Sequence, residues 1–396
     1  MSVADRASVE MEKHTPAFSK LLPMVVPEGV PGEKFLEEVR GILASKQLTN
    51  GAHVRKFEEA AAEYLGVAHC VAVSSCTAGL LLALKVLDLR GEVILPSFTF
   101  HATAHAVAWN GLTPVFADCD AKTFCVAPKA VQAHVSSRTA AILAVHLFGN
   151  PAAVRELEEI AAELQVPLIF DAAHAFGSST GGRRIGGFGT AEVFSFSPTK
   201  LVVAGEGGLI TTQDAGLAEK LRAARNYGDA GNYDPEILGV NARMSEINAA
   251  MALHGLVGLE ARIERRNEIR TRYERNLAGI AGLRFQEISQ GRRSTCKDFS
   301  VIVDQREFGH SRDWLVELLH RENVGARKYF WPPVHRQKLY SALWDGRPLP
   351  VTDMISDSVV SLPIYSSLRD ESIDKVCEVI RRAHRTKNSK WAAGAA

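Results

Sequence analysis

Between residues 69 and 212, short apolar runs rich in β-branched residues alternate with helix-like segments, and this alternation restricts the fold more than any other feature of the chain. The runs are HCVAVS (69–74), EVILP (92–96), TPVFAD (113–118), TAAILAVHLF (139–148), VPLIFDAA (166–173), EVFSFS (192–197) and GGLITT (207–212). Because the runs lack polar alternation, we expect strands buried on both faces, as in a parallel sheet covered by helices. The sequence therefore predicts an α/β domain.

The pattern changes near residue 243. Residues 243–277 are typical of one long helix with a heavily charged second half, and the strand-like DFSVIVD and two further helix-like segments, RDWLVELLHR and SIDKVCEVIRRAHR, follow it. We therefore predict four parts in a chain of this length. They are a flexible tail (1–20), a large domain (21–255), a small α+β domain (256–386) and a second flexible tail (387–396).

Charge and cysteine content exclude several classes of protein. The formal net charge of +1 gives no electrostatic reason to expect nucleic acid or an anionic membrane as the main partner. No apolar run approaches the roughly 18 residues of a membrane-spanning helix, and the N-terminus lacks the apolar centre of a signal peptide. The six cysteines form no C-x-x-C pair, which predicts buried free thiols in a reducing compartment. We expect a cytoplasmic protein.

Two motif-like patterns favour a structural interpretation over a chemical one. GSSTG (177–181) fits the G-x-S-x-G nucleophile elbow, but GGRRIGG follows where a helix should begin. His101 and His105 stand one helical turn apart, a spacing that suits metal ligation, but the segment around them is mostly apolar and no H-E-x-x-H glutamate lies between them. Ordinary packing or a ligand contact is the better interpretation of these histidines, so we expect no metal site.

Four other features favour a common site. Asp171 ends VPLIFD, which places a carboxylate at the carboxyl edge of the sheet, although it could also cap the next helix. SSCT (74–77) lies between a strand and a helix, where hydroxyls and free N–H groups can bind an anion or simply cap the helix. Ser195 and Ser197 add donors. Lys200 follows the hydroxyl-rich FSFSPT and precedes the apolar LVVA, so its amine is either sheltered or part of an ordinary loop.

Together these residues match the needs of pyridoxal phosphate. A sheltered lysine with a lowered pKa can form a Schiff base with the aldehyde of this cofactor. A carboxylate beside the pyridine nitrogen keeps that nitrogen protonated, so that the ring accepts electrons from a carbanion. The helix end can hold the phosphate.

The sequence resembles the DegT-type (StrS-like) sugar aminotransferases from about residue 24 to residue 385. The landmarks occur in order along the chain: LTNGAHVRKFEEAAAEYLGV, AVSSCTAGLLLAL, GEVILPSFTFHATAHAV, TPVFADCD, DAAHAFGS, FSFSPTKLVVAGEGG and GVNARMSEINAAMAL. The resemblance implies the aspartate aminotransferase fold (fold type I), with a large domain built on a mixed, mostly parallel sheet and a small α+β domain.

The same resemblance implies roles for single residues. Lys200 matches the Schiff-base lysine, which also moves the proton between the substrate carbon and C4′ of the cofactor. Asp171 matches the partner of the pyridine nitrogen. His174 stands where many relatives have glutamine, near the phenolic oxygen of the cofactor, and Phe100 matches an aromatic residue that stacks on the ring.

Further positions concern the phosphate, the partner subunit and the substrate. Ser75, Cys76 and Thr77 match the turn that grips the phosphate, and Ser195 matches a further phosphate donor. Asn241 and Arg243 match a segment that reaches into the neighbouring subunit, which implies a homodimer with shared active sites. Tyr329 and His335 lie in a loop that resembles one meeting the substrate. Leu201 departs from the asparagine that is common after the lysine.

The predicted reaction moves an amino group from an amino acid to a keto-sugar, and L-glutamate is the expected donor. Family analogy implies a nucleotide-linked keto-deoxyhexose, and a keto-cyclitol is the nearest alternative. Relatives with histidine in place of Lys200 are dehydratases, so lysine favours transamination over a lyase reaction. A non-catalytic regulatory relative is the third alternative, and the intact Lys200 and Asp171 argue against it.

Overall fold

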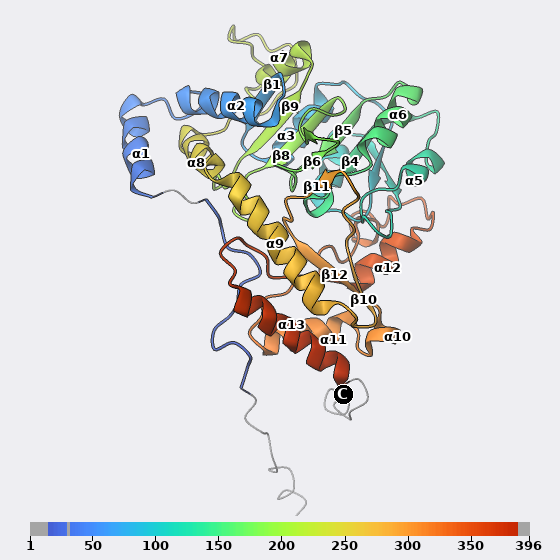
Figure 1. Cartoon of the computed structure of the whole chain (residues 1–396). Coiled ribbons are helices and arrows are strands. Elements are labelled where there is room, and N and C mark those ends of the chain that lie inside the picture. Colours follow the sequence, from blue (N-terminus) through green and yellow to red (C-terminus); the bar gives the residue numbers. More distant parts are fainter. Residues whose placement is uncertain (1–14, 30–31, 387–396) are drawn as a thin grey trace, which may run out of the picture.

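A computed structural model describes residues 15–29 and 32–386, which form a large domain and a small domain joined by the long helix α9 (Leu259–Leu277) (Figure 1). In these residues the large domain holds a seven-stranded sheet in the order β1-β9-β8-β5-β4-β2-β3. The strands are β1 (His69–Val73), β2 (Glu92–Pro96), β3 (Thr113–Ala117), β4 (Thr139–Val145), β5 (Leu168–Asp171), β8 (Ala191–Ser195) and β9 (Gly208–Thr212). Each coincides with a run that the sequence predicts, although β8 begins one residue before its run, and this confirms the α/β prediction.

The sheet is mixed but mostly parallel. Strand β9 runs antiparallel to both β1 and β8, whereas β8, β5, β4, β2 and β3 pair in parallel. This arrangement confirms the predicted fold class. It also brings the carboxyl ends of β5 and β8 side by side, because Asp171 pairs with Val193.

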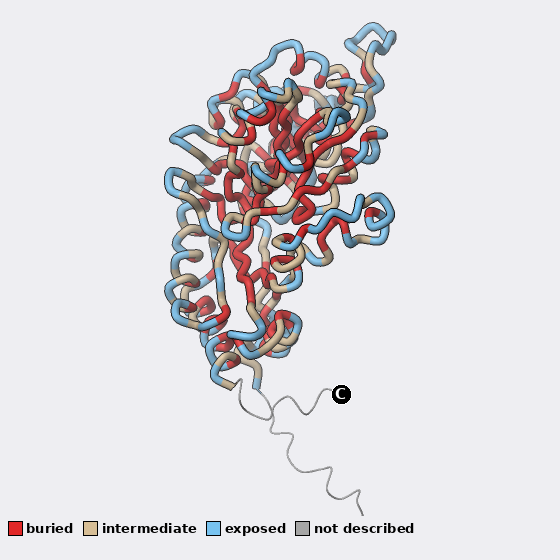
Figure 2. The backbone as a smooth tube through the Cα atoms, turned by 90° about the vertical axis from the view of Figure 1, so that its right-hand side faces the viewer, coloured by how far each residue is buried: buried red, intermediate tan, exposed pale blue. Residues whose placement is uncertain are grey.

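Helices cover both faces of the sheet, and Figure 2 shows the buried chain between them. Successive residues of β5 alternate between two apolar cores, with Ile169 in one core and Phe170 in the other. The core of Ile169 contains residues of α3 (Cys76–Lys85), α4 (His101–Trp109) and α7 (Ala215–Ala224). The core of Phe170 contains residues of α2 (Ala52–Leu65), α5 (Pro128–Ala133), α6 (Val154–Leu164) and α8 (Glu246–Leu256).

The predicted single helix over 243–277 is wrong, because the structure divides it into α8 and α9. The break falls at Gly258, which has φ +69°. Glycine adopts this left-handed conformation without the steric cost that a side chain would add. Helix α9 then runs from the large domain down to the small domain (Figure 1).

The small domain is built on an antiparallel sheet in the order β10-β12-β13, with a third apolar core. Its elements are β10 (Leu283–Phe285), β12 (Phe299–Val303), α10 (Gln305–Phe308), α11 (Arg312–Arg321), α12 (Pro350–Ser358), β13 (Val359–Leu362) and α13 (Asp370–Arg385). A second three-stranded sheet joins β11 (Arg292–Arg293) to β6 (Ser179–Thr180) and β7 (Arg183–Arg184) of the large domain. GSSTG leads into this small sheet instead of a helix, so it forms no nucleophile elbow.

The N-terminal segment packs differently from the predicted boundaries. The N–H groups of Phe18 and Leu22 donate to the backbone of Glu322 and Asn323, and the carbonyl of Met24 accepts from Ile364. Residues 18–24 therefore pack on the small domain, before the chain reaches α1 (Glu33–Ser45) beside the large one (Figure 1). The physical reason is the pairing of this segment with the loop after α11. The rest of the predicted tails, at 1–14 and 387–396, lies outside the described residues.

Within the described ranges we find no helix that combines the length and apolar composition needed to cross a lipid bilayer.

Candidate active site

A cavity of about 350 Å³ opens where β5, β8 and the start of α3 meet the small domain. Ten of the residues predicted from the sequence line it: Ser75, Cys76, Thr77, Phe100, Asp171, His174, Ser195, Ser197, Lys200 and Tyr329. They come from five separate segments of the chain, at 75–77, 100, 171–174, 195–200 and 329. The fold thus brings together most of the predicted site.

Lys200 presents its amine to this cavity from the turn between β8 and β9. Its N–H donates to the carbonyl of Ser197 at 3.0 Å, and the buried Leu201 and Val202 that follow hold the turn against the core. Burial in the first place, and the nearby charge of Lys297 in the second, lower the pKa of the Lys200 ammonium to about 8. A much larger share of the amine is therefore neutral at physiological pH than in an exposed lysine.

Asp171 ends β5 and is buried at the bottom of the cavity. The Thr103 hydroxyl donates to Oδ2 at 2.7 Å, and the N–H of Ala173 donates to Oδ1 at 3.1 Å. Burial raises the pKa of the Asp171 carboxyl, whereas these two hydrogen bonds and the charge of Lys200 oppose that rise. The carboxylate is fixed in orientation, and a cation beside it would be strongly favoured.

The N-terminus of α3 faces the same cavity. Ser75 caps the helix by accepting from the N–H of Ala78 at 3.1 Å, and among the described residues the N–H groups of Cys76 and Thr77 have no acceptor. A Cβ on Gly208 would lie 2.5 Å from the carbonyl carbon of Ser75, so only glycine lets β9 approach this turn. Ser195 lies on the neighbouring strand. These donors at a positive helix end form an anion site.

His174 is held in one neutral tautomer. The N–H of Phe148 donates to Nδ1 at 3.1 Å, so the ring proton is on Nε2. Burial lowers the pKa of His174 well below its usual value, and the charges of Lys200 and Lys297 act in the same direction. The ring therefore offers one N–H to the cavity, as the glutamine of many relatives would.

Three predicted site residues do not line the cavity of their own chain: Asn241, Arg243 and His335. Arg243 donates from Nε to Asn241 and from Nη1 to Asn226, and its guanidinium lies over Tyr227. His335 is buried between the two domains, where its Nδ1 lies 2.7 Å from the Ser97 hydroxyl.

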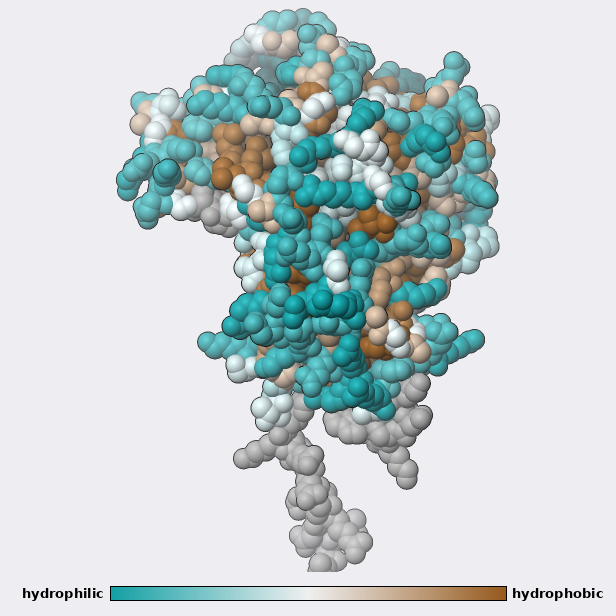
Figure 3. Space-filling view, in the orientation of Figure 1, coloured by the Kyte–Doolittle hydropathy of each residue, from teal (hydrophilic) through white to brown (hydrophobic). Residues whose placement is uncertain are grey.

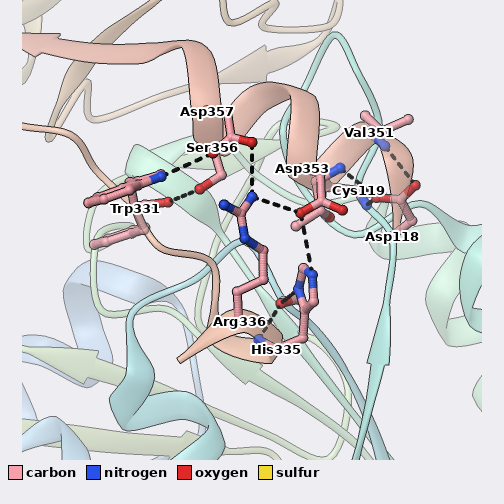
Figure 4. A network of polar contacts seen from close by, with 12 residues as sticks. Asp118, Cys119, Trp331, His335, Arg336, Val351, Asp353, Ser356 and Asp357 are labelled. Atoms are coloured by element: carbon pink, nitrogen blue, oxygen red, sulfur yellow. Dashed lines mark hydrogen bonds and ion pairs between the residues drawn. The ribbon is translucent and has the colours of Figure 1, made fainter. Parts of the chain in front are cut away.

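The contacts around His335 join the loop that carries Tyr329 to α12, as Figure 4 shows. Nε2 of His335 lies 3.4 Å from Asp353, and Arg336 bridges Asp353 and Asp357 on successive turns of α12. From the large domain, Asp118 accepts the N–H of Thr352 at 2.7 Å and so caps the start of the helix. This network positions the loop that carries Tyr329.

Sequence reasoning missed several cavity residues. Lys297 and Asp298 line the cavity from the coil before β12, and Phe330 lies beside Tyr329. The sequence offered one local feature here, two consecutive charges directly before the apolar FSVIV, and this feature is equally typical of a solvated turn. Thr103 was also missed, although it stands four residues after Thr99 on the helix that faces Asp171.

The donor set fits pyridoxal phosphate. The cavity combines a lysine amine with a lowered pKa, a fixed carboxylate, an anion site at a helix end, a neutral N–H donor and the aromatic ring of Phe100. When bound, this cofactor supplies an electron sink for a carbanion at the substrate carbon. Lys200 would hold its aldehyde carbon, Asp171 its ring nitrogen and the start of α3 its phosphate.

Comparisons with known proteins agree with this chemistry. The chain is 33% identical over 367 residues to dTDP-4-amino-4,6-dideoxy-D-glucose transaminase of Escherichia coli, covering 91% of this chain and 98% of the relative. It is 34% identical to UDP-N-acetyl-3-dehydro-alpha-D-glucosamine 3-aminotransferase of Acidithiobacillus ferrooxidans, covering 88% and 94%. The crystal structure of DesI in the presence of its TDP-sugar product matches with a TM-score of 0.90 and 39% identity, covering 94% and 95%.

The profile of the DegT/DnrJ/EryC1/StrS aminotransferase family matches residues 31–381. This range includes both domains and every residue that lines the cavity. The chain therefore belongs to the DegT/DnrJ/EryC1/StrS aminotransferase family and is a pyridoxal-phosphate-dependent aminotransferase.

Proposed function

We propose that the protein moves an amino group from L-glutamate to the carbonyl carbon of a nucleotide-linked keto-deoxyhexose. One observation carries this proposal: the Lys200 amine faces Asp171 and the start of α3 across a single cavity. The relatives named above support the acceptor class, because their names specify sugars linked to dTDP, UDP or TDP. A lysine at this position also favours amino transfer over dehydration.

The cavity residues have separate roles in this proposed reaction. Nζ of Lys200 would hold the proton that moves at the substrate carbon, first with the amino donor and again with the sugar. The Asp171 carboxylate would hold the ring nitrogen of the cofactor and favour its protonated form. Nε2 of His174 would donate to the phenolic oxygen, and the N–H groups of Cys76 and Thr77 would hold the phosphate. Tyr329 orients the substrate at the cavity entrance.

The working enzyme in this proposal is a homodimer. Asn241 is exposed and Arg243 is half-buried outside the cavity of its own chain, so a second subunit can receive them. Exposed apolar side chains on and near α1 and after α8 support an interface there: Leu36 is 47%, Leu43 55%, Leu48 49% and Val257 74% exposed. Figure 3 shows apolar surface beside α8 on this side of the molecule.

The proposal places the protein in the cytoplasm. All six cysteines are free, and five of them are buried. Thiols of this kind suit a reducing compartment, where a disulfide framework is not needed.

The two halves of the reaction can be tested separately. L-Glutamate added to the holoenzyme should release one equivalent of 2-oxoglutarate per site and remove the visible absorption band of the lysine-linked cofactor. The aminated enzyme should then regain that band only with a suitable nucleotide-linked keto-sugar. Release of keto acid without recovery of the band by any sugar nucleotide, but with recovery by a keto-cyclitol, would reject the acceptor class. A Lys200→Ala enzyme is the control for both steps.

A further inference from the structure

Lys297 and Asp298 form a buried ion pair that the cofactor chemistry described above does not use. The two residues are only 4% and 5% exposed, and they line the same cavity as Lys200. Nζ of Lys297 lies 2.9 Å from Oδ1 and 3.1 Å from Oδ2 of Asp298. Among the described residues neither side chain has another hydrogen-bond partner, and the ammonium lies 5.8 Å from the centre of the Tyr329 ring.

The backbone around this pair is rigidly held. The N–H of Lys297 donates to the carbonyl of Phe148 in the large domain at 3.0 Å. Its own carbonyl accepts from Nη1 of Arg266 at 3.0 Å, and Arg266 is fully buried on α9 and paired with Glu28. The backbone that carries this ammonium is thus held by the large domain and by the connecting helix α9, and such a fixed support is what a substrate-binding group requires.

The pair has little value for stability. Taking two charges out of water costs several kcal/mol per ion, and apolar residues of similar size are often equally stabilising or more so. An ion pair between consecutive residues also joins no two elements of the fold. We therefore attribute the pair to binding.

The position of Lys297 points to one part of the substrate. Its charge acts on both the Lys200 amine and the His174 ring. Lys200 and His174 are assigned to the aldehyde carbon and the phenolic oxygen of the cofactor, which are attached to adjacent ring atoms. An amino acid that replaces Lys200 at the aldehyde carbon carries its α-carboxylate close to both groups.

We propose that Lys297 binds the α-carboxylate of the amino donor, and that Asp298 balances its charge when the sugar occupies the cavity. This inference rests on the proposed amino transfer from an amino acid. One cavity must accept an anionic donor and then a sugar ring that is neutral at the reacting carbon. An ammonium has three N–H groups, so it can contact the donor while still paired with Asp298. When the donor leaves, Asp298 remains as the counter-ion and no buried charge is left unpaired.

The test compares Lys297→Met with the wild-type holoenzyme in the donor half-reaction alone. The half-saturating concentration of L-glutamate should rise about 10- to 100-fold, the usual loss for a charged hydrogen bond. The half-saturating concentrations of L-glutamine and L-alanine should rise by the same factor, because both amino acids share the α-carboxylate. The half-saturating concentration of the keto-sugar with the aminated enzyme should change less than threefold. The matched control is Lys328→Met, which removes a half-buried lysine that is paired with Asp313 outside the cavity.

A binding readout separates this role from a structural one. Glutarate, which carries carboxylates but no amine, should perturb the visible band of the wild-type cofactor and bind at least tenfold more weakly to Lys297→Met. The double variant Lys297→Met/Asp298→Leu removes both charges and leaves no ion unpaired, so it provides the same measurement if the single variant misfolds.

Three results would overturn the inference. One is an unchanged L-glutamate response in either variant that retains the visible band. Another is a loss confined to L-glutamate, which would assign Lys297 to the side-chain carboxylate. The third is a larger loss for the keto-sugar than for the donors. Failure of the proposed function has a different signature, because the wild-type enzyme itself would then release no keto acid from any amino acid.

Discussion

The cavity has a floor and a wall that come from different domains and differ in how their side chains are fixed. The floor consists of Ser75, Asp171, Ser195 and Lys200, which stand at strand ends, a helix cap and a turn of the large domain. The small-domain wall consists of Lys297, Asp298, Tyr329 and Phe330, which lie in coil segments. In the proposed function the floor binds the cofactor, which every substrate needs, whereas the wall contacts the substrate. This difference gives separate experimental signatures for the two regions.

The largest effect should come from the floor. Lys200→Ala removes both the covalent attachment of the cofactor and the group that moves the proton, so we expect a loss of activity of about 10⁴-fold. The visible band of the lysine-linked cofactor should disappear, while far-ultraviolet circular dichroism stays unchanged. Activity within tenfold of wild type would show that another group moves the proton.

The floor could be predicted from the sequence because each of its residues is adjacent to a strong local pattern. Asp171 follows an apolar strand, and Ser75 precedes an apolar helix, so the topology of parallel strands alone brings them to one edge. The strand positions could be predicted for the same reason. The break at Gly258 could not, since the helical periodicity continues across it and only the packing of two domains selects the left-handed conformation.

The small-domain wall could not be placed from the sequence. Lys297 is distant along the chain from Lys200, and nothing local shows that this coil returns to the cavity. Two consecutive charges normally indicate a solvated turn, and only tertiary contacts bury these two. Likewise His335 was expected at the substrate, but its partners Ser97 and Asp353 lie on other elements and hold it outside the cavity lining.

The second prediction concerns Asp171→Asn, which keeps the shape of the side chain and removes its charge. Without a carboxylate the pyridine nitrogen loses its proton, so the amino-transfer rate should fall about 10²- to 10³-fold. Single-turnover absorbance measurements with L-glutamate would give this rate. Thr103→Val is the matched variant, because it removes one hydrogen bond from the carboxylate but leaves the charge. Equal losses in the two variants would contradict a special role for the charge.

The third prediction uses the fixed tautomer of His174. His174→Gln retains an N–H donor, so the rate of the donor half-reaction should stay within about threefold of wild type. His174→Leu removes the donor, so the same rate should fall about tenfold. Both losses should appear in the rate of the donor half-reaction, and the wavelength of the visible band should shift only in His174→Leu. If glutamine and leucine give the same result, the N–H of His174 does not contact the cofactor.

The last prediction tests whether the wall acts on the floor through charge. The pKa of Lys200 is lowered to about 8 by burial first and by Lys297 second, and Asp298 opposes that shift. A neutral amine is the form that captures the cofactor aldehyde. Because a lysine with a lowered pKa becomes neutral at lower pH, uptake of pyridoxal phosphate by the apoenzyme should rise with pH, with its midpoint near pH 8, and level off at higher pH.

Removing the charge of Lys297 should shift the pH profile of cofactor uptake to higher pH. In Lys297→Met the lowering influence is lost and the opposing carboxylate of Asp298 is left unpaired, so both changes raise the pKa of Lys200. The midpoint of the uptake profile should therefore shift to higher pH, and uptake at pH 7 should slow by a few-fold. Lys297→Met/Asp298→Leu removes both charges and should shift the midpoint less, because their influences on Lys200 have opposite signs. A midpoint that stays fixed in both variants would show that burial alone sets the reactivity of the floor, and that the wall acts only on the substrate.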